Sequence, residues 1–226
     1  MNHKDLKWYH SIVLLNGEKT KGDTDYSVWN STHYLFPDDL TGKSVIDFGT
    51  FDGYWAIETK KRGAAEVVAV DGHSPPLPTA SLAPGERGIP LVSDREIDLD
   101  VPLSPKIVIP NWGNWDAVLF YGIVYHMKNP VQGLKTAAAA CKPGGTVIVE
   151  SAVCEGRCAE LSADIPAMWL IDKEHNLDPT NYVMPNESGL LQRPCVSLPT
   201  PQPKSSALRL GKSFLREAIY FINQSM

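Results

Sequence analysis

The sequence predicts an α/β fold in which a doubly wound, mostly parallel sheet is covered by helices. Between residues 44 and 150, apolar runs of strand length alternate with helix-forming stretches. Most of these runs are almost continuously apolar, which is typical of parallel strands buried on both faces. A glycine-rich turn follows the first run and an acid ends the second. Sheets of this kind bind nucleoside-containing cofactors at the carboxyl ends of their strands.

The size and composition limit the class of protein. The chain has 226 residues, of which 43% are hydrophobic, enough for one substantial core. Its net charge is -5 and it has no block of lysine or arginine, so no general nucleic-acid surface is predicted. No apolar run reaches the roughly 18 residues that span a bilayer, and the N-terminus lacks a signal-peptide segment. We therefore expect a soluble, cytoplasmic protein without a membrane partner.

The cysteines predict neither a disulfide framework nor a metal site. Their irregular spacing suits a reducing compartment: Cys141, Cys154, Cys158 and Cys195. Cys154 and Cys158 are four residues apart, but a zinc site normally needs four ligands. We interpret all four as structural residues and predict no metal.

The first elements form a βαβ unit. Residues 44–48 are an apolar strand, and residues 54–62 carry helix-forming side chains that stop at Gly63. Residues 67–70 form a second apolar strand. Connections of this type are right-handed in nearly all sheets.

An irregular region follows. Five prolines between residues 74 and 90 predict a loop where doubly wound folds usually have a helix. Residues 91–97 are a weakly marked third strand, and residues 107–109 form a short edge strand.

Regular structure then returns. Residues 116–120 are predicted as a strand and residues 130–141 as an alanine-rich helix, with Asn129 as its N-cap. A turn at residues 142–145 leads into a fifth strand at 146–150.

The carboxyl-terminal part has weaker signals. We predict a short helix at residues 165–171, a helix beginning within 182–191, a linker over 190–206 and an amphipathic helix over 213–223. The predicted organisation is an aromatic N-terminal cap (1–38), a cofactor-binding domain (39–192), and an atypical segment with a proline-rich linker and a helix (193–226).

The turn after the first strand is the main candidate site. Its small residues let backbone amides approach a ligand closely. Asp47, placed before the glycines, suits the ammonium and sulfonium charges of S-adenosylmethionine better than a nicotinamide dinucleotide. The alternative is a plain strand–helix connection. The predicted cofactor-binding residues of this loop are Asp47, Gly49, Thr50, Phe51, Gly53 and Tyr54.

Two further groups extend the cofactor site. Asp71, with Gly72 and His73, ends the second strand, where a carboxylate binds both ribose hydroxyls. A helix-capping role is the alternative for Asp71. Ile97 and Asp98 end the third strand, where an apolar side chain packs on adenine and an acid accepts its amino group; simple solvation is the alternative for Asp98.

The loop after the fourth strand supplies the candidate catalytic residues. Tyr121 and Gly122 are predicted to line the methyl-donor site. His126 is the best general base by type, because its ordinary pKa lies near neutrality, and Tyr125 is a second candidate. The alternative for His126 is a structural histidine that bonds the loop before Pro130.

At these residues the chain resembles class I S-adenosylmethionine-dependent methyltransferases, in the branch that contains the tRNA wobble-uridine carboxymethyltransferase. Three stretches carry the resemblance: DLTGKSVIDFGTFDGY at 39–54, WDAVLFYGIVYH at 115–126 with NP at 129–130, and NYVMPNES at 181–188. The resemblance implies a Rossmann-like sheet, S-adenosylmethionine as the cofactor, and donor contacts at Gly49, Asp71–His73, Ile97–Asp98, Tyr121 and Tyr125.

The chain also departs from that branch. Phe51 stands where a middle glycine is common, and residues 26–33 (YSVWNSTH) lack the lysine with which the tRNA enzymes grip a carboxylated donor. These differences favour the ordinary methyl donor. The helix and closing strand pair expected after Ser188 are not recognisable in residues 193–206.

The predicted function is S-adenosylmethionine-dependent methyl transfer to an oxygen or nitrogen atom of a small or medium-sized acceptor. The cap residues Trp8, His10, Tyr26 and Trp29 are candidates to shape the acceptor site. One alternative is a tRNA wobble-uridine modifying enzyme, with tRNA as a less favoured partner. Another is a non-catalytic, nucleoside-binding protein of methyltransferase fold.

Overall fold

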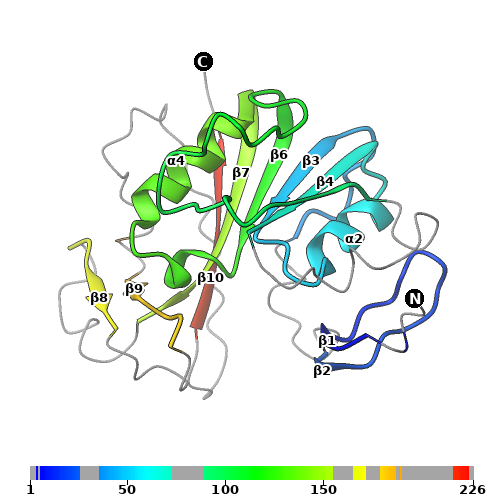
Figure 1. The fold of residues 1–226 in the computed structure, drawn as a ribbon, viewed down its shortest axis with the longest axis horizontal. Helices are drawn as coiled ribbons and strands as arrows, with labels where there is room; N and C mark the ends of the chain where they lie inside the picture. Colours follow the sequence, from blue (N-terminus) through cyan, green and yellow to red (C-terminus); the bar gives the residue numbers. More distant parts are fainter. Residues whose placement is uncertain are drawn as a thin grey trace.

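The centre of the computed structural model is a six-stranded sheet in the order β10-β7-β6-β3-β4-β5 (Figure 1). The structure describes residues 4, 6–25, 36–72, 89–154, 165–171, 179–186 and 189 and, for the backbone, 216–223. The strands are β3 (Ser44–Phe48), β4 (Glu66–Asp71), β5 (Leu91–Ser93), β6 (Trp115–Tyr121), β7 (Cys141–Val153) and β10 (Arg216–Asn223). The first five are parallel to their neighbours, and β10 is antiparallel to β7. The predicted mostly parallel sheet is confirmed.

The sheet is accompanied by the helices α2 (Tyr54–Lys61) and α4 (Pro130–Ala140) and by the 3-10 helix η3 (Val124–His126). Helix α4 begins as predicted, because the Asn129 side chain accepts the N–H of Gln132 at 3.3 Å and Pro130 occupies the first turn. Among the described residues, no helix combines the length and the apolar character that a bilayer crossing requires.

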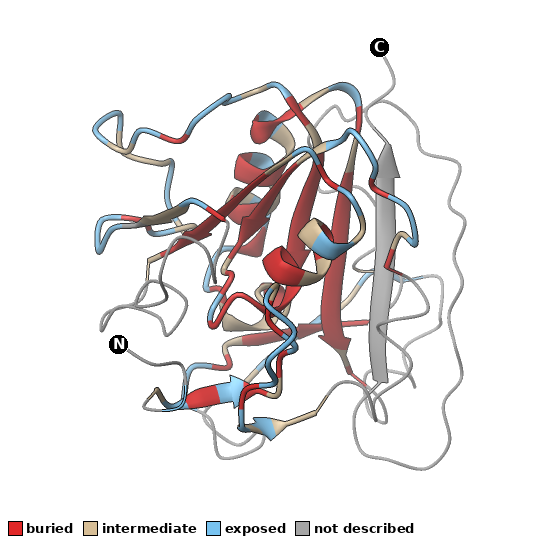
Figure 2. Cartoon of the chain, turned by 90° about the vertical axis from the view of Figure 1, so that its right-hand side faces the viewer, coloured by how far each residue is buried: buried red, intermediate tan, exposed pale blue. Residues whose placement is uncertain are grey.

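The core has two parts, one on each face of the sheet. On the face that we call the α2 face, buried residues of α2 and the strands pack together, among them Val45, Ile57, Val67, Ala117 and Leu119. On the opposite α4 face, a second cluster contains Ile46, Phe120, Ala137, Ala140 and Val149. Figure 2 shows the central strands buried along their length. This is the double coverage that the continuous apolar runs predict.

The N-terminal segment packs against the α2 face. It contains a short parallel pair, β1 (Trp8–His10) and β2 (Gly22–Thr24), and Trp8, Ile12 and Leu14 join the buried cluster there. A Cβ atom on Gly22 would lie 2.2 Å from the His10 carbonyl carbon. Only glycine therefore permits this approach of β2 to β1.

The loops beside the sheet differ from the prediction at two points. Residues 107–109 are not a strand: Ile107 N–H donates to the Ser104 carbonyl at 2.9 Å in a turn, and Ile109 is buried on the α4 face. Their apolar character therefore reflects packing of a loop. Strand β5 ends at Ser93 and not at 97, because the chain turns back and Ile97 N–H donates to the Asp94 carbonyl at 3.0 Å.

The predicted turn at 142–145 lies inside β7. Trp115 pairs with Cys141, whereas Ala117 pairs with Thr146, so residues 142–145 bulge out opposite Asp116. Gly144 has a φ of 77°, which a residue without a Cβ adopts readily. The strand continues on both sides of this bulge.

The helices predicted at 165–171 and 213–223 are wrong, whereas Gly189 is helical, within the range 182–191 where a helix was predicted to begin, and its N–H donates to Asn186 Oδ1 at 2.7 Å. Within 165–171 and 182–191 the chain forms an antiparallel hairpin of β8 (Met168–Leu170) and β9 (Val183–Pro185). Residues 216–223 form β10, which completes the sheet against β7. Residues 218–222 are a short, unbroken apolar run, and such runs suit a strand as well as a helix. Residues 216–223 form a strand because the edge of β7 offers backbone hydrogen bonds to it.

Candidate active site

Four polar side chains form a row across the carboxyl ends of neighbouring strands. Asp47 is in register with Ala69 and Leu119, and Tyr121 is in register with Glu150. Side chains alternate along a strand, so the members of the row, Asp71, Asp47, Tyr121 and Glu150, face the same side as the α2-face core. All four are buried. The sheet therefore brings three carboxyl groups and one phenol to the edge where such folds bind ligands.

The turn after β3 adopts a conformation that glycine favours. Gly49 and Gly53 have φ values of 62° and 87°, and Phe51 has a φ of 51° despite its side chain. The Phe51 N–H donates to Asp71 Oδ2 at 2.8 Å. The acid that ends β4 therefore helps to hold the β3 turn. A Cβ on Gly49 would lie 2.8 Å from Ile123 Cδ1, so this position is also sterically restricted.

Asp47 stabilises the turn from inside. Its Oδ2 accepts the Thr50 hydroxyl at 2.7 Å, and its carboxyl group also accepts the Ala56 N–H. Burial raises the pKa of Asp47 to about 7, and the nearby Asp71 and Asp52 add to this effect, while the Thr50 and Ala56 hydrogen bonds oppose it. An added positive charge would favour the ionised form.

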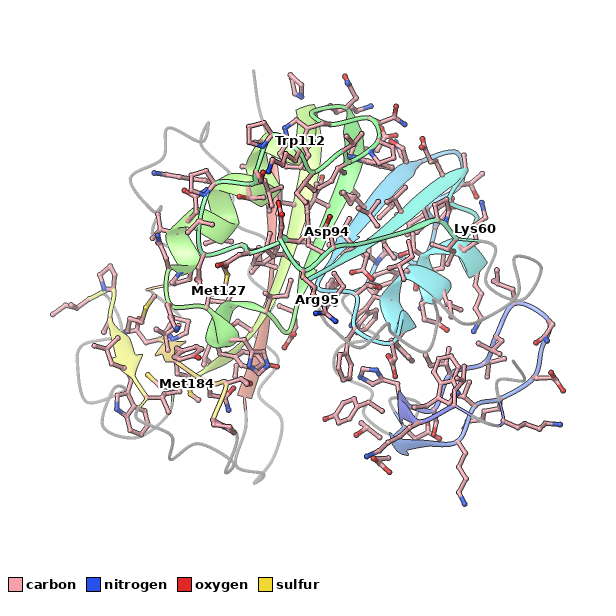
Figure 3. The ribbon with its side chains drawn as sticks, in the orientation of Figure 1. Lys60, Asp94, Arg95, Trp112, Met127 and Met184 are labelled. Atoms are coloured by element: carbon pink, nitrogen blue, oxygen red, sulfur yellow. The ribbon has the colours of Figure 1, made fainter. Side chains whose placement is uncertain are left out.

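The end of β4 meets the turn after β5. A Cβ on Gly72 would lie 2.2 Å from the Ile97 carbonyl oxygen, so Gly72 and Ile97 are in close contact, as the predicted site requires. Asp94 N–H donates to the Asp71 carbonyl at 3.3 Å; Asp94 and its neighbour Arg95 are labelled in Figure 3. Asp98 is exposed, and its Oδ1 accepts the Asp100 N–H at 2.9 Å. His73 lies outside the described residues.

Tyr121 carries a buried hydroxyl at the centre of the row. Its side chain packs on Trp55, with ring centroids 4.5 Å apart. The hydroxyl oxygen makes no hydrogen bond to the described part of the chain. Burial, and then the charges of Glu150 and Asp47, raise the Tyr121 pKa well above its ordinary value. A buried polar atom of this kind is a position where a ligand group is expected.

The side chains of Tyr125 and Glu150 both approach Gly122. The Tyr125 hydroxyl and Glu150 Oε2 lie 3.4 and 3.8 Å from the place that a Cβ on Gly122 would occupy. Gly122 has a φ of 67°. The structure thus places the Tyr125 hydroxyl beside Glu150, at the end of the row.

His126 is bonded to the segment before β9. Its Nδ1 lies 3.1 Å from the Thr180 carbonyl oxygen and 3.0 Å from the Thr180 hydroxyl. The neighbouring Tyr182 N–H donates to the Tyr125 carbonyl at 2.8 Å. His126 therefore has a structural contact, although to Thr180 and not to the loop before Pro130.

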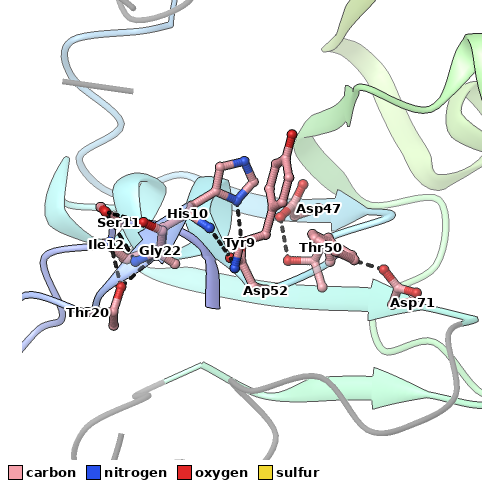
Figure 4. Close-up of polar contacts among 11 residues, drawn as sticks. Tyr9, His10, Ser11, Ile12, Thr20, Gly22, Asp47, Thr50, Asp52 and Asp71 are labelled. Atoms are coloured by element: carbon pink, nitrogen blue, oxygen red, sulfur yellow. Dashed lines mark hydrogen bonds and ion pairs between the residues drawn. The ribbon is translucent and has the colours of Figure 1, made fainter. Parts of the chain in front are cut away.

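Sequence reasoning missed Asp52 and Glu150. Asp52 Oδ1 lies 2.6 Å from His10 Nδ1, and Asp52 Oδ2 accepts the N–H groups of Tyr9 (3.1 Å) and His10 (2.7 Å), as Figure 4 shows. No local pattern indicates this contact across 42 residues. Glu150, in contrast, follows a strand-like apolar run, the same signal that identified Asp71.

The aromatic candidates of the cap have different environments. Trp8 is 2% exposed and belongs to the core, so it does not offer a surface to an acceptor. His10 pairs with Asp52. Tyr26 and Trp29 lie outside the described residues. Tyr9 and Phe51 are exposed, and their ring centroids lie 5.6 Å apart.

The described cysteines fit the structural interpretation. Cys141 and Cys154 are buried free thiols, and burial raises the pKa of Cys141 to about 11. Over the described ranges, no group of three or more histidine, cysteine, aspartate or glutamate side chains could hold a metal ion.

Comparison with known proteins shows that this chain is similar to methyltransferases. A family model described as a methyltransferase domain matches residues 23–180. The tRNA U34 carboxymethyltransferase of Idiomarina loihiensis is 30% identical over 129 residues, which cover 53% of this chain and 36% of that protein. The protein of the same name from Desulfotalea psychrophila is 27% identical over 167 residues, covering 72% and 47%. The chain thus spans about a third to a half of these relatives.

A solved structure shares the fold over most of the chain. The Burkholderia thailandensis 1,6-didemethyltoxoflavin-N1-methyltransferase, solved with 1,6-didemethyltoxoflavin and S-adenosylhomocysteine, matches with a TM-score of 0.59 at 17% identity. The match covers 88% of this chain and 81% of that one. It establishes the likeness of the fold.

Proposed function

Because the chain belongs to the methyltransferase domain family, we propose that it transfers a methyl group from S-adenosylmethionine to an oxygen or nitrogen atom of a small or medium-sized acceptor. The family assignment confirms the resemblance to class I methyltransferases. The observation that best supports the proposed site is the hydrogen bond from Phe51 N–H to Asp71 Oδ2. It joins the glycine turn of β3 and the acid of β4 into one unit at the edge where ligands bind.

The described residues fit the donor. The buried acids Asp47, Asp71 and Glu150 give the site a negative potential suited to a sulfonium cation. The Tyr121 hydroxyl, which bonds to none of the described residues, offers a hydrogen-bonding partner within the same row. When bound, S-adenosylmethionine supplies an activated methyl group that an acceptor atom displaces in line.

Each predicted residue then has a proposed role. The backbone of Gly49–Gly53 binds the polar end of the donor, with Asp47 and Thr50 fixing its conformation. Asp71 binds the ribose, with Gly72 and His73 beside it. Ile97 packs on the adenine, and Asp98 accepts the adenine amino group. Tyr121, Gly122 and Tyr54 complete the surface around the methyl group.

On the acceptor side, we assign proton removal to His126 or Tyr125 when the acceptor atom is oxygen. The contact of His126 Nδ1 with Thr180 fixes the orientation of the ring. Alignment and exclusion of water account for most of the rate enhancement, because the donor is already activated.

Calorimetry tests the donor assignment. We expect S-adenosylmethionine to bind, NAD not to bind, and Asp71→Ala to lower the affinity at least roughly tenfold, as for loss of a charged hydrogen-bonding group. Asp94→Ala is the matched control, because Asp94 is an exposed acid whose backbone N–H donates to the Asp71 carbonyl, while its side chain accepts the N–H of Glu96 two residues away at 2.9 Å. Equal binding by the wild type and Asp71→Ala would contradict the proposed site.

A second candidate is tRNA modification, which is supported by the names of the curated relatives. Against it stand the net charge of -5 and the sequence 26–33, which lacks lysine. The test supplies labelled S-adenosylmethionine with bulk tRNA or with a metabolite extract. Label in the metabolite fraction supports the main proposal, label in tRNA supports the second candidate, and donor binding without transfer to either pool indicates a non-catalytic protein.

A further inference from the structure

Asp52 joins the N-terminal segment to the glycine turn. Asp52 is 1% exposed and directly precedes Gly53, the N-cap residue of α2. Both oxygens are occupied by β1: Oδ1 by the His10 imidazole at 2.6 Å, and Oδ2 by the backbone N–H groups of Tyr9 and His10 (Figure 4). A buried carboxylate is costly without such partners, so β1 and the turn hold each other in place.

The aromatic rings reinforce this contact. The His10 ring lies 5.2 Å from the Tyr54 ring and 6.4 Å from the Phe51 ring, measured between centroids. The backbone of Phe51 is also held by the bond of its N–H to Asp71 Oδ2. The strained left-handed conformation of Phe51 is therefore set by two carboxyl groups, one of which acts through the N-terminal segment.

We propose that Asp52 is a positioning residue, and that through the Asp52–His10 pair the N-terminal segment sets the conformation of the methyl-donor loop. This inference rests on the proposed function, because it takes the turn to be the donor site. Linkage is reciprocal. If β1 stabilises the binding-competent turn, then donor binding must stabilise β1 by the same free energy.

The test uses S-adenosylhomocysteine, which needs no acceptor. We expect Asp52→Asn and His10→Ala each to weaken its binding at least roughly tenfold, because each breaks a buried charge-assisted contact. His10→Asn retains an N–H near the position of Nδ1 and should restore binding to within about threefold of the wild type. Two independent variants keep the test valid if one of them does not fold.

Asp116→Asn is the matched control. Asp116 also accepts a backbone N–H and a hydroxyl, both from Ser44 at 2.9 Å, and pairs with Lys142. It lies at the opposite, amino-terminal end of the strands. Its loss should affect stability without changing the affinity for S-adenosylhomocysteine.

Hydrogen exchange separates positioning from a merely structural role. In the wild type and Asp116→Asn, S-adenosylhomocysteine should slow exchange at residues 8–24; in Asp52→Asn this protection should be lost. If the wild type binds but both broken-pair variants bind within twofold of it, the positioning role is refuted and the proposed function stands. If the wild type itself does not bind, both are refuted.

Discussion

Replacing Asp47 with asparagine tests the electrostatics of the site most directly. Burial raises the pKa of this carboxyl group from 3.8 to about 7. The folded chain therefore binds a proton between about pH 4 and pH 7 that the unfolded chain has released, so stability falls as the pH rises through this window. One pKa unit corresponds to about 1.4 kcal/mol, so the ionised group costs the folded state up to about 4 kcal/mol above pH 7.

Asp47→Asn removes this pH-dependent cost. Asparagine can still accept the Thr50 hydroxyl with its carbonyl oxygen, but it loses one acceptor, which costs about 1–3 kcal/mol at every pH. The absolute difference between the variants is therefore less informative than its change with pH. Between pH 5 and pH 8, the free energy of unfolding of Asp47→Asn should rise by roughly 2–3 kcal/mol relative to the wild type.

Urea denaturation at pH 5, 6, 7 and 8 measures this change. In parallel, calorimetry at pH 8 should show at least roughly tenfold weaker binding of S-adenosylmethionine to Asp47→Asn, because the variant loses a negative charge that favours the sulfonium cation and an acceptor that holds the loop. As the pH rises, Asp47→Asn would then gain stability relative to the wild type while binding the donor more weakly. Parallel pH profiles for the two proteins would refute the reasoning, since they would mean that Asp47 is ionised at little cost in the folded chain.

Three further predictions follow from the same structure. Gly72→Ala should lower the free energy of unfolding by about 1–3 kcal/mol in thermal or urea denaturation, because its Cβ would collide with the Ile97 carbonyl oxygen; unchanged stability would contradict the close approach. Burial of Asp116 alone would raise its pKa, but Lys142 and Ser44 outweigh burial and lower it to about 2. Asp116→Asn should therefore lower the free energy of unfolding by about 1 kcal/mol or less near pH 7, after solvent screening. This difference from the wild type should fade as the pH falls from 4 to 2, whereas ionisation of Asp47 lowers stability as the pH rises. Cys141, with a pKa of about 11, should react with iodoacetamide at pH 8 about a hundredfold more slowly than an exposed thiol; mass spectrometry measures the rate, and fast labelling of the folded protein would refute its burial.

Local patterns explain which parts of the fold were predictable. The strand at 44–48, the helix that follows it and the strand ending at Asp71 each carry their signal within a few residues, as apolar periodicity, glycine placement or a terminal acid. Helix α4 is identified in the same way by Asn129 and Pro130. Residues 216–223 carried an ambiguous signal, because a short apolar run fits either a helical stripe or an edge strand.

The sequence by itself determined the parallel sheet, the glycine turn and the order in which Asp47, Asp71 and Tyr121 follow their strands. Only the tertiary structure decided that Glu150 joins the same row, because the register between strands places it beside Tyr121. Only the tertiary structure brought His10 to Asp52. The physical reason is that periodicity is a property of one segment, whereas a contact across 42 residues depends on how separate segments pack.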